Sequence, residues 1–506
     1  AEESIIKTEL EFDTLEDGTL GFTMDDLDSE HNSEDLVLDP LVLKPRLKDG
    51  ELRICFFTAT FYILDGVTLT LRRIISHLEA AGGKACIVTT VPAADFDTEG
   101  YDIIEVPGTP IPIPGEEYGY KFGTGLDSNT TKKILDFQPS VCHFTVPDLV
   151  GVDGVKFAIA QGVPYFATWH SNYCDYMKYY YVEWWLRPPV MHYFKYFYSH
   201  MPQLLVPTPF IRSKLENEGF DQITRMKIWG RGVDMQIFNP SRRSQEFRSR
   251  YGIGAEEVVL LWVGRLVQEK RPEIWVDVAR RLTQEGVPFK GLVVGKGSFQ
   301  TEMEALENVR VAGWLSGEEL GVAYASADCL LFPSDVETFG NVTLEALASG
   351  VPCVVEQGCS GHLVENGKNG FTAPSGDVEK FYTATKRIIM DAQLRKSFRP
   401  KCVAKAKEYE RSKILQRMLE HYKDCHQRHD PEGLRQEQAR LPAYRCCYVV
   451  PLDAAVKLGK LLGCIFTFII TFFMSVVANC KACISRRARL ARRSTLPIVS
   501  ESRRKR

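Results

Sequence analysis

The chain lacks the sequence signatures of several common enzyme classes. No GxGxxG follows the first predicted strand and no GxxxxGK[ST] is present, so a nicotinamide or P-loop nucleotide site has little support. Its 14 cysteines include one CxxC, Cys480–Cys483, but no second CxxC that would complete a zinc site, and so large a chain does not depend on a disulfide framework. We therefore expect reduced, mostly buried thiols.

The length of the chain and its charge distribution indicate how many domains and which tails to expect. At 506 residues the chain is too long for one core, and a prior of roughly 100–200 residues per domain predicts two or three domains. The 44% hydrophobic and 25% charged fractions are those of a globular protein that folds in water. Net charge is −3, but residues 1–40 hold 14 acidic side chains against Lys7, and residues 481–506 hold 10 basic ones against Glu501. We expect a disordered acidic arm at 1–48 and a basic tail at 481–506.

Short apolar runs alternate with amphipathic segments of helical length from Arg53 onward, which predicts βαβ units around parallel sheets. The first series of expected strands is Ile54–Phe57, Ala85–Thr89, Val141–Phe144, Tyr165–Thr168, Leu204–Val206 and Lys227–Trp229. After a connector at Phe238-Asn239-Pro240, the second series is Val258–Val263, Gly291–Val294, Val309–Ala312, Cys329–Phe332 and Cys353–Glu356. The pattern predicts an α/β protein with two doubly wound halves.

The most informative stretch is Phe332–Leu347, with the sequence FPSDVETFGNVTLEAL. A strand ends at Pro333 and a helical pattern begins near Gly340, so Glu337 lies at the carboxyl edge of the strand and Glu345 lies in the helix. Open α/β sheets bind ligands at that edge. A helix N-terminus offers N–H groups to an anion, and carboxylates accept hydrogen bonds from hydroxyls. Such a site suits sugar hydroxyls beside phosphate oxygens.

The two glutamates eight residues apart in ETFGNVTLEA resemble the paired-glutamate motif of retaining family 4 glycosyltransferases, which have the GT-B fold. Residues 262–270 (WVGRLVQEK) resemble the family's VGR…EK segment, and residues 229–240 (WGRGVDMQIFNP) resemble its interdomain connector. Residues 227–248 and the TWHS at 168–171 are most similar to the sulfoquinovosyltransferase and alpha-mannosyltransferase members. The resemblance covers about residues 52–425. It implies two Rossmann-like domains facing a central cleft, an acceptor domain at 49–235 and a donor domain at 236–430.

The resemblance also implies which residues hold a nucleotide-diphosphate sugar. Arg265 follows the first strand of the second half and Lys270 precedes a helix starting near Pro272, so both can neutralise a diphosphate. Glu345 would bind the ribose and Glu337 the donor sugar. The remaining donor-binding positions expected are Gly264, Gly295, Gly297, Thr338, Phe339 and Gly340. The acidic residues near Glu337 form no Asp-x-Asp site, and the resemblance implies transfer without a metal or other cofactor.

The acceptor side is expected in the first half. His170 follows a predicted strand at its carboxyl edge and, in its TWHSN setting, could face the donor as a fourth catalytic residue beside Glu337, Arg265 and Lys270; a structural histidine is the alternative. Asp65 and Gly66 follow the first strand, where glycine permits close approach of a substrate. The family usually has a Gly pair there, whereas this chain has Gly66 alone. Residues 176–198 hold 11 aromatic side chains, which form either a packed core or a lipid-facing entrance.

A nearly charge-free run at 461–478 (LLGCIFTFIITFFMSVVA) is long enough to cross a bilayer. We expect a linker at 431–460 and a membrane-spanning or membrane-inserted helix at 461–480; a buried core helix is the alternative. A sequon at Asn341 lies beside the expected donor site, where a glycan would block binding. This favours a catalytic body on the cytoplasmic or plastid-stromal side over a lumenal one.

We therefore predict a membrane-associated, retaining glycosyltransferase that moves a sugar from a nucleotide-diphosphate donor to a lipid acceptor. One alternative keeps the fold but uses a GDP-mannose-type donor and a glycan or glycolipid acceptor. Another is an inactive scaffold that acts as a membrane interaction subunit, although retention of Glu337, Glu345, Arg265 and Lys270 in this order counts against it. No nucleic-acid partner is expected.

Overall fold

The computed structural model describes residues 51–62, 66–91, 98–111, 120–170, 172–180 and 183–427. The expected arm at 1–48, the linker at 431–460, the expected membrane helix at 461–480 and the basic tail at 481–506 all lie outside these residues. Within them, none of the helices combines the length and the hydropathy that spanning a bilayer requires.

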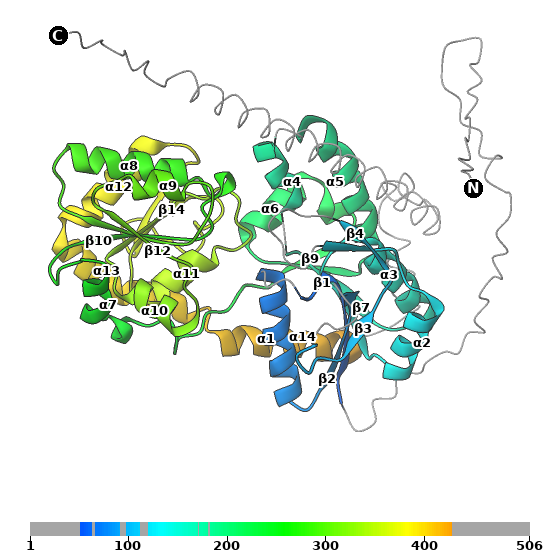
Figure 1. Ribbon diagram of the computed structural model, residues 1–506. Coiled ribbons are helices and arrows are strands. Elements are labelled where there is room, and N and C mark those ends of the chain that lie inside the picture. The colour runs from blue at the N-terminus through cyan, green and yellow to red at the C-terminus, as the bar shows by residue number, and fades with distance from the viewer. Residues whose placement is uncertain are drawn as a thin grey trace, which may run out of the picture. The chain divides into compact units, whose positions relative to one another are not determined.

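The first domain is built on a seven-stranded parallel sheet with the strand order β3-β2-β1-β6-β7-β8-β9 (Figure 1). Its strands are β1 (Arg53–Thr60), β2 (Lys84–Thr90), β3 (Ile103–Glu105), β6 (Val141–Phe144), β7 (Tyr165–Thr168), β8 (Gln203–Val206) and β9 (Arg225–Ile228). A separate antiparallel hairpin pairs β4 (Gly108–Ile111) with β5 (Tyr120–Gly123). The helices are α1 (Gly66–Ala80), α2 (Ser128–Phe137), α3 (Leu149–Gln161), α4 (Tyr173–Tyr176), α5 (Glu183–Ser199) and α6 (Pro209–Asn217).

The second domain has a six-stranded parallel sheet with the order β12-β11-β10-β13-β14-β15. Its strands are β10 (Val259–Val263), β11 (Lys290–Val294), β12 (Val309–Gly313), β13 (Cys329–Phe332), β14 (Cys353–Glu356) and β15 (Gly370–Ala373). Counted within the domain this is the order 3-2-1-4-5-6 of dinucleotide-binding folds, in which the strand order reverses between β10 and β13. In open sheets of this kind, ligands bind beyond the carboxyl ends of the two strands at the reversal.

Helices cover both faces of the second sheet (Figure 1). The helix α8 (Pro272–Gln284) packs against α12 (Val378–Met390) on one face, and α11 (Asn341–Ala348) packs against α13 (Ala392–Lys407) on the other. Shorter helices are α7 (Gln245–Arg250), α9 (Gln300–Glu304) and α10 (Gly317–Ala325). The helix α8 begins with Pro272, whose fixed φ suits a first helical position, and buries Ile274, Trp275, Val278 and Leu282 in the core. Its start agrees with the sequence prediction.

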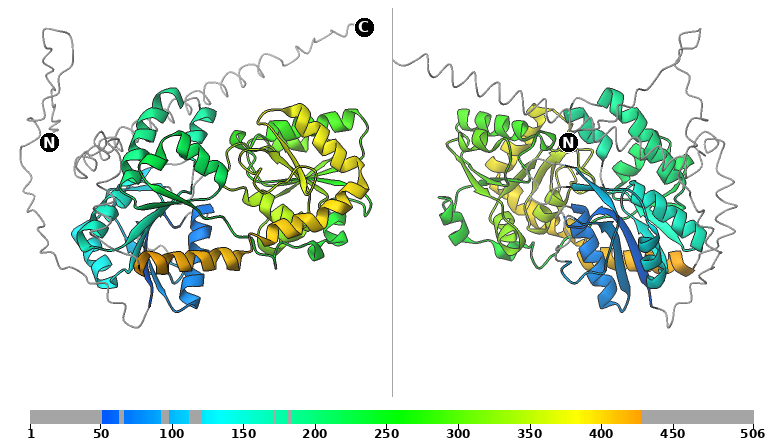
Figure 2. Two further views of the ribbon diagram at one scale, coloured as in Figure 1. Left: turned by 180° about the vertical axis from the view of Figure 1, so that it is seen from behind. Right: turned by 45° about the vertical axis from the view of Figure 1, so that its right-hand side comes forward.

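The last described helix, α14 (Arg411–Gln427), belongs structurally to the first domain although it follows the second in the chain. It packs against α1 and β6 (Figures 1 and 2), and its buried Ile414, Met418, Leu419 and Tyr422 join the core around β1. The sequence analysis placed residues 236–430 in one donor domain and did not foresee that α14 packs on the first domain. Two backbone hydrogen bonds join the connecting segments, from Val233 N–H to the carbonyl oxygen of Tyr409 and from Arg411 N–H to that of Val233, both at 2.9 Å.

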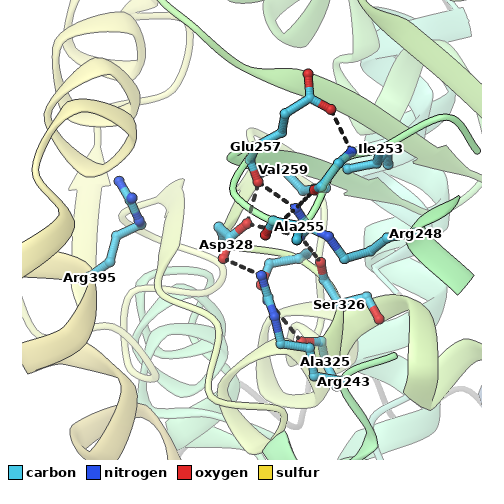
Figure 3. Close-up of polar contacts among 12 residues, drawn as sticks. Arg243, Arg248, Ile253, Ala255, Glu257, Val259, Ala325, Ser326, Asp328 and Arg395 are labelled. Carbon is cyan, nitrogen blue, oxygen red and sulfur yellow. Dashed lines mark hydrogen bonds and ion pairs between the residues drawn. The ribbon is translucent and has the colours of Figure 1, made fainter. Parts of the chain in front are cut away.

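A buried ion network fixes the loops around β10 (Figure 3). The Arg248 side chain is only 1% exposed, and its guanidinium donates to the carbonyl oxygens of Gly254 (2.6 Å), Glu257 (2.5 Å) and Ser326 (2.9 Å). It also pairs with the carboxylate of Asp328 at 3.4 Å. That carboxylate receives Arg399 at 2.8 Å and Arg243 at 3.2 Å as well as the N–H of Val259. Because each buried charge is paired and hydrogen-bonded, the network ties α7 and α13 to the start of β10.

Candidate functional site

The candidate site lies at the carboxyl edge of the second sheet, where the strand order reverses. The loop after β10 carries Gly264, Arg265 and Lys270, and the loop after β13 runs from Pro333 to Gly340. Since β10 and β13 are neighbouring parallel strands, two segments almost 70 residues apart in sequence emerge side by side. The sequence predicted both loops at this edge.

Lys270 and Glu337 join the two loops directly. The Lys270 Nζ lies 2.5 Å from Glu337 Oε1, and the two side chains are 14% and 15% exposed. The same carboxylate oxygen accepts a hydrogen bond from the Ser334 hydroxyl at 2.9 Å, and the Glu337 N–H donates to Cys359 Sγ at 3.3 Å. These contacts fix the Glu337 side chain at this edge, while about a seventh of its surface stays exposed, at 15%.

Arg265 presents its guanidinium to solvent beside this pair. Its side chain is 60% exposed, and it contacts Glu269 Oε1 at 3.2 Å, where Glu269 itself is buried. One carboxylate occupies one nitrogen of the fork, so the other N–H groups can bind an added anion. Arg265 and Lys270 thus place two basic side chains at this edge, and each is paired with a glutamate.

Glycines let the loops after β10 and β11 (264–266 and 295–297) lie in backbone contact. Gly264, Gly295 and Gly297 have φ values of 139°, 142° and 153°. A Cβ atom on Gly295 would come within 1.9 Å of the Gly264 carbonyl oxygen, and one on Gly297 within 2.4 Å of the Leu266 carbonyl oxygen. The two loops therefore touch backbone to backbone, which glycine at these positions permits.

The helix α11 begins behind the second loop. Its N-cap Gly340 has φ 91°, and a Cβ atom there would lie 2.4 Å from Ser360 Oγ, so glycine is required. The Phe339 side chain is 2% exposed and packs against the rings of His362 and Tyr409. Only the backbone of Phe339 is thus available at the site, next to the partly buried Thr338.

Glu345 lies one turn into α11 and accepts a hydrogen bond from the Tyr324 hydroxyl at 2.9 Å. Burial raises the pKa of the Glu345 carboxyl to about 7, against the opposing effects of that hydrogen bond and of the Arg73 and Arg411 charges. Its carboxylate is therefore poised between its two protonation states near neutral pH. In this structure the Glu345 carboxyl group is hydrogen-bonded to Tyr324.

His170 is part of a buried chain of polar groups. Its Nε2 lies 2.5 Å from Thr168 Oγ1, which lies 2.9 Å from His143 Nε2, and His143 Nδ1 lies 2.7 Å from the Tyr422 hydroxyl. At the other end Arg231 Nη2 donates to His170 Nδ1 at 2.7 Å. Because arginine only donates, His170 carries its hydrogen on Nε2 and is neutral.

The pKa values agree with this assignment. Burial, followed by the Arg231 and His143 charges, lowers the pKa of His170 well below its usual range. Burial, followed by the His421 and Arg231 charges, lowers the pKa of His143 to about 3. The structure thus engages both ring nitrogens of His170 within the protein and leaves it 5% exposed. Its catalytic role stays a prediction.

On the expected acceptor side, Asp65 lies outside the described residues, and Gly66 is the exposed first residue of α1. A Cβ atom added to Gly66 would meet nothing within 4 Å, so this position is open. The aromatic segment at 176–198 is partly packed core and partly exposed surface. Residues Phe194 and Tyr196–Tyr198 are buried in the first core, whereas Trp184 at the start of α5 is 81% exposed.

The sequence did not single out Asp335. Its carboxylate, 8% exposed, accepts hydrogen bonds from the Ser375 hydroxyl at 2.6 Å and from the Tyr179 hydroxyl, and it pairs with Lys178 and Arg271 at 3.3 Å. It thereby links the aromatic segment of the first domain to the loop that carries Glu337. In the sequence, the one feature that could have pointed to Asp335 is its position two residues before Glu337.

The described residues contain no group of three or more His, Cys, Asp or Glu side chains able to hold a metal ion. All nine cysteines in the described ranges are free, and eight of them are buried.

Two family models match the chain in succession. The model described as Glycosyltransferase Family 4 matches residues 64–237, and the model described as Glycosyl transferases group 1 matches residues 257–391. The second match includes every residue of the β10–β13 edge described above. The first covers α1, the hairpin and the His170 region.

Several named proteins are similar to most of the chain. The sulfoquinovosyl transferase of Arabidopsis thaliana is 29% identical over 379 residues, 73% of this chain and 72% of the relative. A GDP-mannose-dependent alpha-mannosyltransferase of Corynebacterium glutamicum is 26% identical over 368 residues, 71% and 86% of the two chains. An alpha-monoglucosyldiacylglycerol synthase of Streptococcus pneumoniae is 24% identical over 318 residues, 60% and 70% of the two chains. Among solved structures, sucrose-phosphate synthase from Thermosynechococcus elongatus shares the fold, with a TM-score of 0.61, 18% identity, and coverage of 74% and 99%.

Proposed function

The chain is a glycosyltransferase of the GT-B fold, with a family 4 domain followed by a group 1 domain, and we propose that it transfers a sugar from a nucleotide-diphosphate donor to a lipid acceptor. The observation that carries the proposal is the Lys270–Glu337 pair at the reversal of the second sheet, with Arg265 exposed beside it.

The sheet edge that carries Arg265 and Lys270 is the proposed diphosphate site. A diphosphate leaving group gains negative charge as the bond to the sugar breaks, and donors fixed in advance stabilise that charge without reorganisation. Arg265 supplies an exposed planar fork, and Lys270 supplies a point charge held in place by Glu337. Glu337 in turn keeps a partly exposed carboxylate that can accept hydroxyl groups of the donor sugar.

The bare backbone of Gly264, Gly295 and Gly297 is the proposed floor beneath the nucleotide, and Glu345 is proposed to accept the ribose hydroxyls once it leaves Tyr324. Transfer is proposed to proceed with retention and without a metal. His170 is proposed to act at the sugar, oriented by Thr168 and Arg231. A relative that makes monoglucosyldiacylglycerol supports the lipid acceptor.

Three similar GDP-mannose-dependent alpha-mannosyltransferases, 26–29% identical, support a second candidate donor. The two candidates share the diphosphate site and differ in nucleotide and sugar. A single donor panel therefore separates them.

The test is thermal unfolding of the full chain with UDP-glucose, UDP-sulfoquinovose and GDP-mannose, each with a chelator present. A ligand that binds only the native state at about 100 times its Kd stabilises the protein by about 2.7 kcal/mol. We expect one donor to raise the Tm and Arg265→Ala to abolish the shift. The control is Arg280→Ala, which removes an exposed arginine of α8 that pairs, among the described residues, with Asp277 and Glu302. No shift with any donor in folded protein would refute the proposal.

The acceptor is tested with the labelled donor that binds. We expect label to move into the organic phase when diacylglycerol vesicles are supplied. Label in a water-soluble glycan instead would replace the lipid acceptor by a glycan.

Membrane association is proposed through residues 461–478, which lie outside the described residues. A charge at the centre of a spanning helix costs about 2.5–3.5 kcal/mol. Phe468→Arg should therefore release the chain from vesicles in flotation, whereas Phe468→Leu should not.

A further inference from the structure

A hollow lies at the carboxyl edge of the first sheet, and none of the expected donor residues lines it. It has a volume of about 700 Å³, within the range of roughly 300–1,000 Å³ typical of small-molecule sites. Pro207 follows β8 and Trp229 follows β9 at this edge, and the helix α14 lines the hollow as well. Parallel sheets bind ligands at this edge of their strands.

The walls of this hollow are strongly cationic. Lys227, Lys407, Lys413 and Arg417 line it, against the single carboxylate of Glu408. That carboxylate is already held by Lys405 at 2.8 Å.

Three of the four cations lack a carboxylate partner in the part of the chain that the structure describes. Lys413 pairs with Glu410 at 3.1 Å, whereas Lys227, Lys407 and Arg417 have no carboxylate there within ion-pair distance. Like charges gathered around one hollow repel each other, and a bound anion would offset that repulsion.

The remaining walls add apolar and neutral polar surface. Trp229, Tyr409 and Ile414 provide aromatic and aliphatic faces. His421 is neutral at pH 7, because burial and the Lys227 charge lower its pKa to about 4. This lining suits a ligand that combines an anionic group with an apolar portion.

We propose that this hollow binds a phosphate-bearing ligand at a site separate from the nucleotide-sugar site. Phosphate chemistry could come from a phospholipid headgroup or from a soluble phosphate ester. The site is formed by residues that the proposed transfer reaction does not use, so the two proposals can be tested independently.

The test is calorimetric titration of the full chain with three probes: dihexanoyl phosphatidylglycerol, dihexanoyl phosphatidylcholine and glycerol 3-phosphate. The pocket variant is Lys407→Gln with Arg417→Gln, one change in α13 and one in α14. The matched control is Lys396→Gln with Lys423→Gln, which removes two exposed lysines from the same helices outside the hollow. Unliganded Tm values verify that both variants fold.

We expect an anionic probe to bind and the pocket variant to weaken it on the order of tenfold at low salt, with the control unchanged. Binding of phosphatidylglycerol alone identifies a lipid headgroup, and binding of glycerol 3-phosphate as well identifies the phosphate group as sufficient. Arg265→Ala should leave this binding intact even if no nucleotide sugar ever binds. The proposal is overturned if no anionic probe binds, if phosphatidylcholine binds equally well, or if the control pair weakens binding as much as the pocket pair.

Discussion

Lys270 and Glu337 should be strongly coupled in the unliganded protein, and a double-mutant cycle measures the coupling. The changes are Lys270→Met, Glu337→Gln and the two together. At 2.5 Å and an effective dielectric constant of about 20, the attraction is about 6–7 kcal/mol before desolvation is subtracted. Removing one partner of a buried pair costs about 3–5 kcal/mol. Because Glu337 keeps the Ser334 hydroxyl, we expect about 3 kcal/mol for Lys270→Met.

The double variant should lose little more than Lys270→Met alone, which gives a coupling free energy of about 2–3 kcal/mol. Hydrogen exchange of the β10 and β13 amides is the suitable assay, because it reports opening of the second domain separately from the first. Additive effects within about 0.5 kcal/mol would show that the two side chains do not act as a pair, and the proposed diphosphate site would lose its organising contact. The same Lys270→Met change should also lower the affinity for the donor identified in the thermal unfolding test, by on the order of a hundredfold.

Three further predictions concern the scaffold of the site. Arg248→Met should destabilise the second domain by about 3–5 kcal/mol in hydrogen exchange, because it removes a buried guanidinium that donates to three carbonyl oxygens and pairs with Asp328; a loss below about 1 kcal/mol would mean that the network is dispensable. Gly295→Ala should abolish donor-dependent stabilisation because its Cβ would strike the Gly264 backbone, whereas Gly286→Ala, at φ 67° with nothing within 4 Å, should cost only about 1 kcal/mol of strain; equal effects would remove the steric argument. The pKa of Glu345 is about 7 in the folded protein against an ordinary value of 4.5, so the folded state binds the extra proton and stability falls as pH rises from 4.5 to 7 by at most about 3 kcal/mol. In Glu345→Gln the Tm should stay nearly constant between pH 4.5 and 7. If the Tm of this variant still fell with pH as in the parent protein, another group would cause the pH dependence.

Much of the fold was predictable because buried parallel strands are short continuous apolar runs. The bounds of β6, β7, β13 and β14 match the sequence predictions residue for residue. The missed strands include β15, which begins with Gly370 and has two half-buried residues, and the three-residue β3 at a sheet edge. Edge strands bury less and so carry a weaker pattern.

The site was predictable in its position but not in its bonding. Motif spacing placed Lys270 and Glu337 at one sheet edge, because strand order determines which loops meet. That the two side chains pair, and that Ser334 holds the carboxylate, depends on rotamers that no local pattern encodes. The polar chain through His143 and Tyr422 joins residues 279 positions apart and has no local signature at all.

The return of α14 makes the first domain discontinuous in sequence, which bears on its synthesis at the ribosome. His143, buried in β6, finds its Nδ1 partner only when Tyr422 has emerged, after the whole second domain. Domains generally fold as units while the chain is made, starting from the N-terminus. Here the earlier domain must wait with part of its core exposed until the later one is complete, and closing that core draws together the two segments that connect the domains.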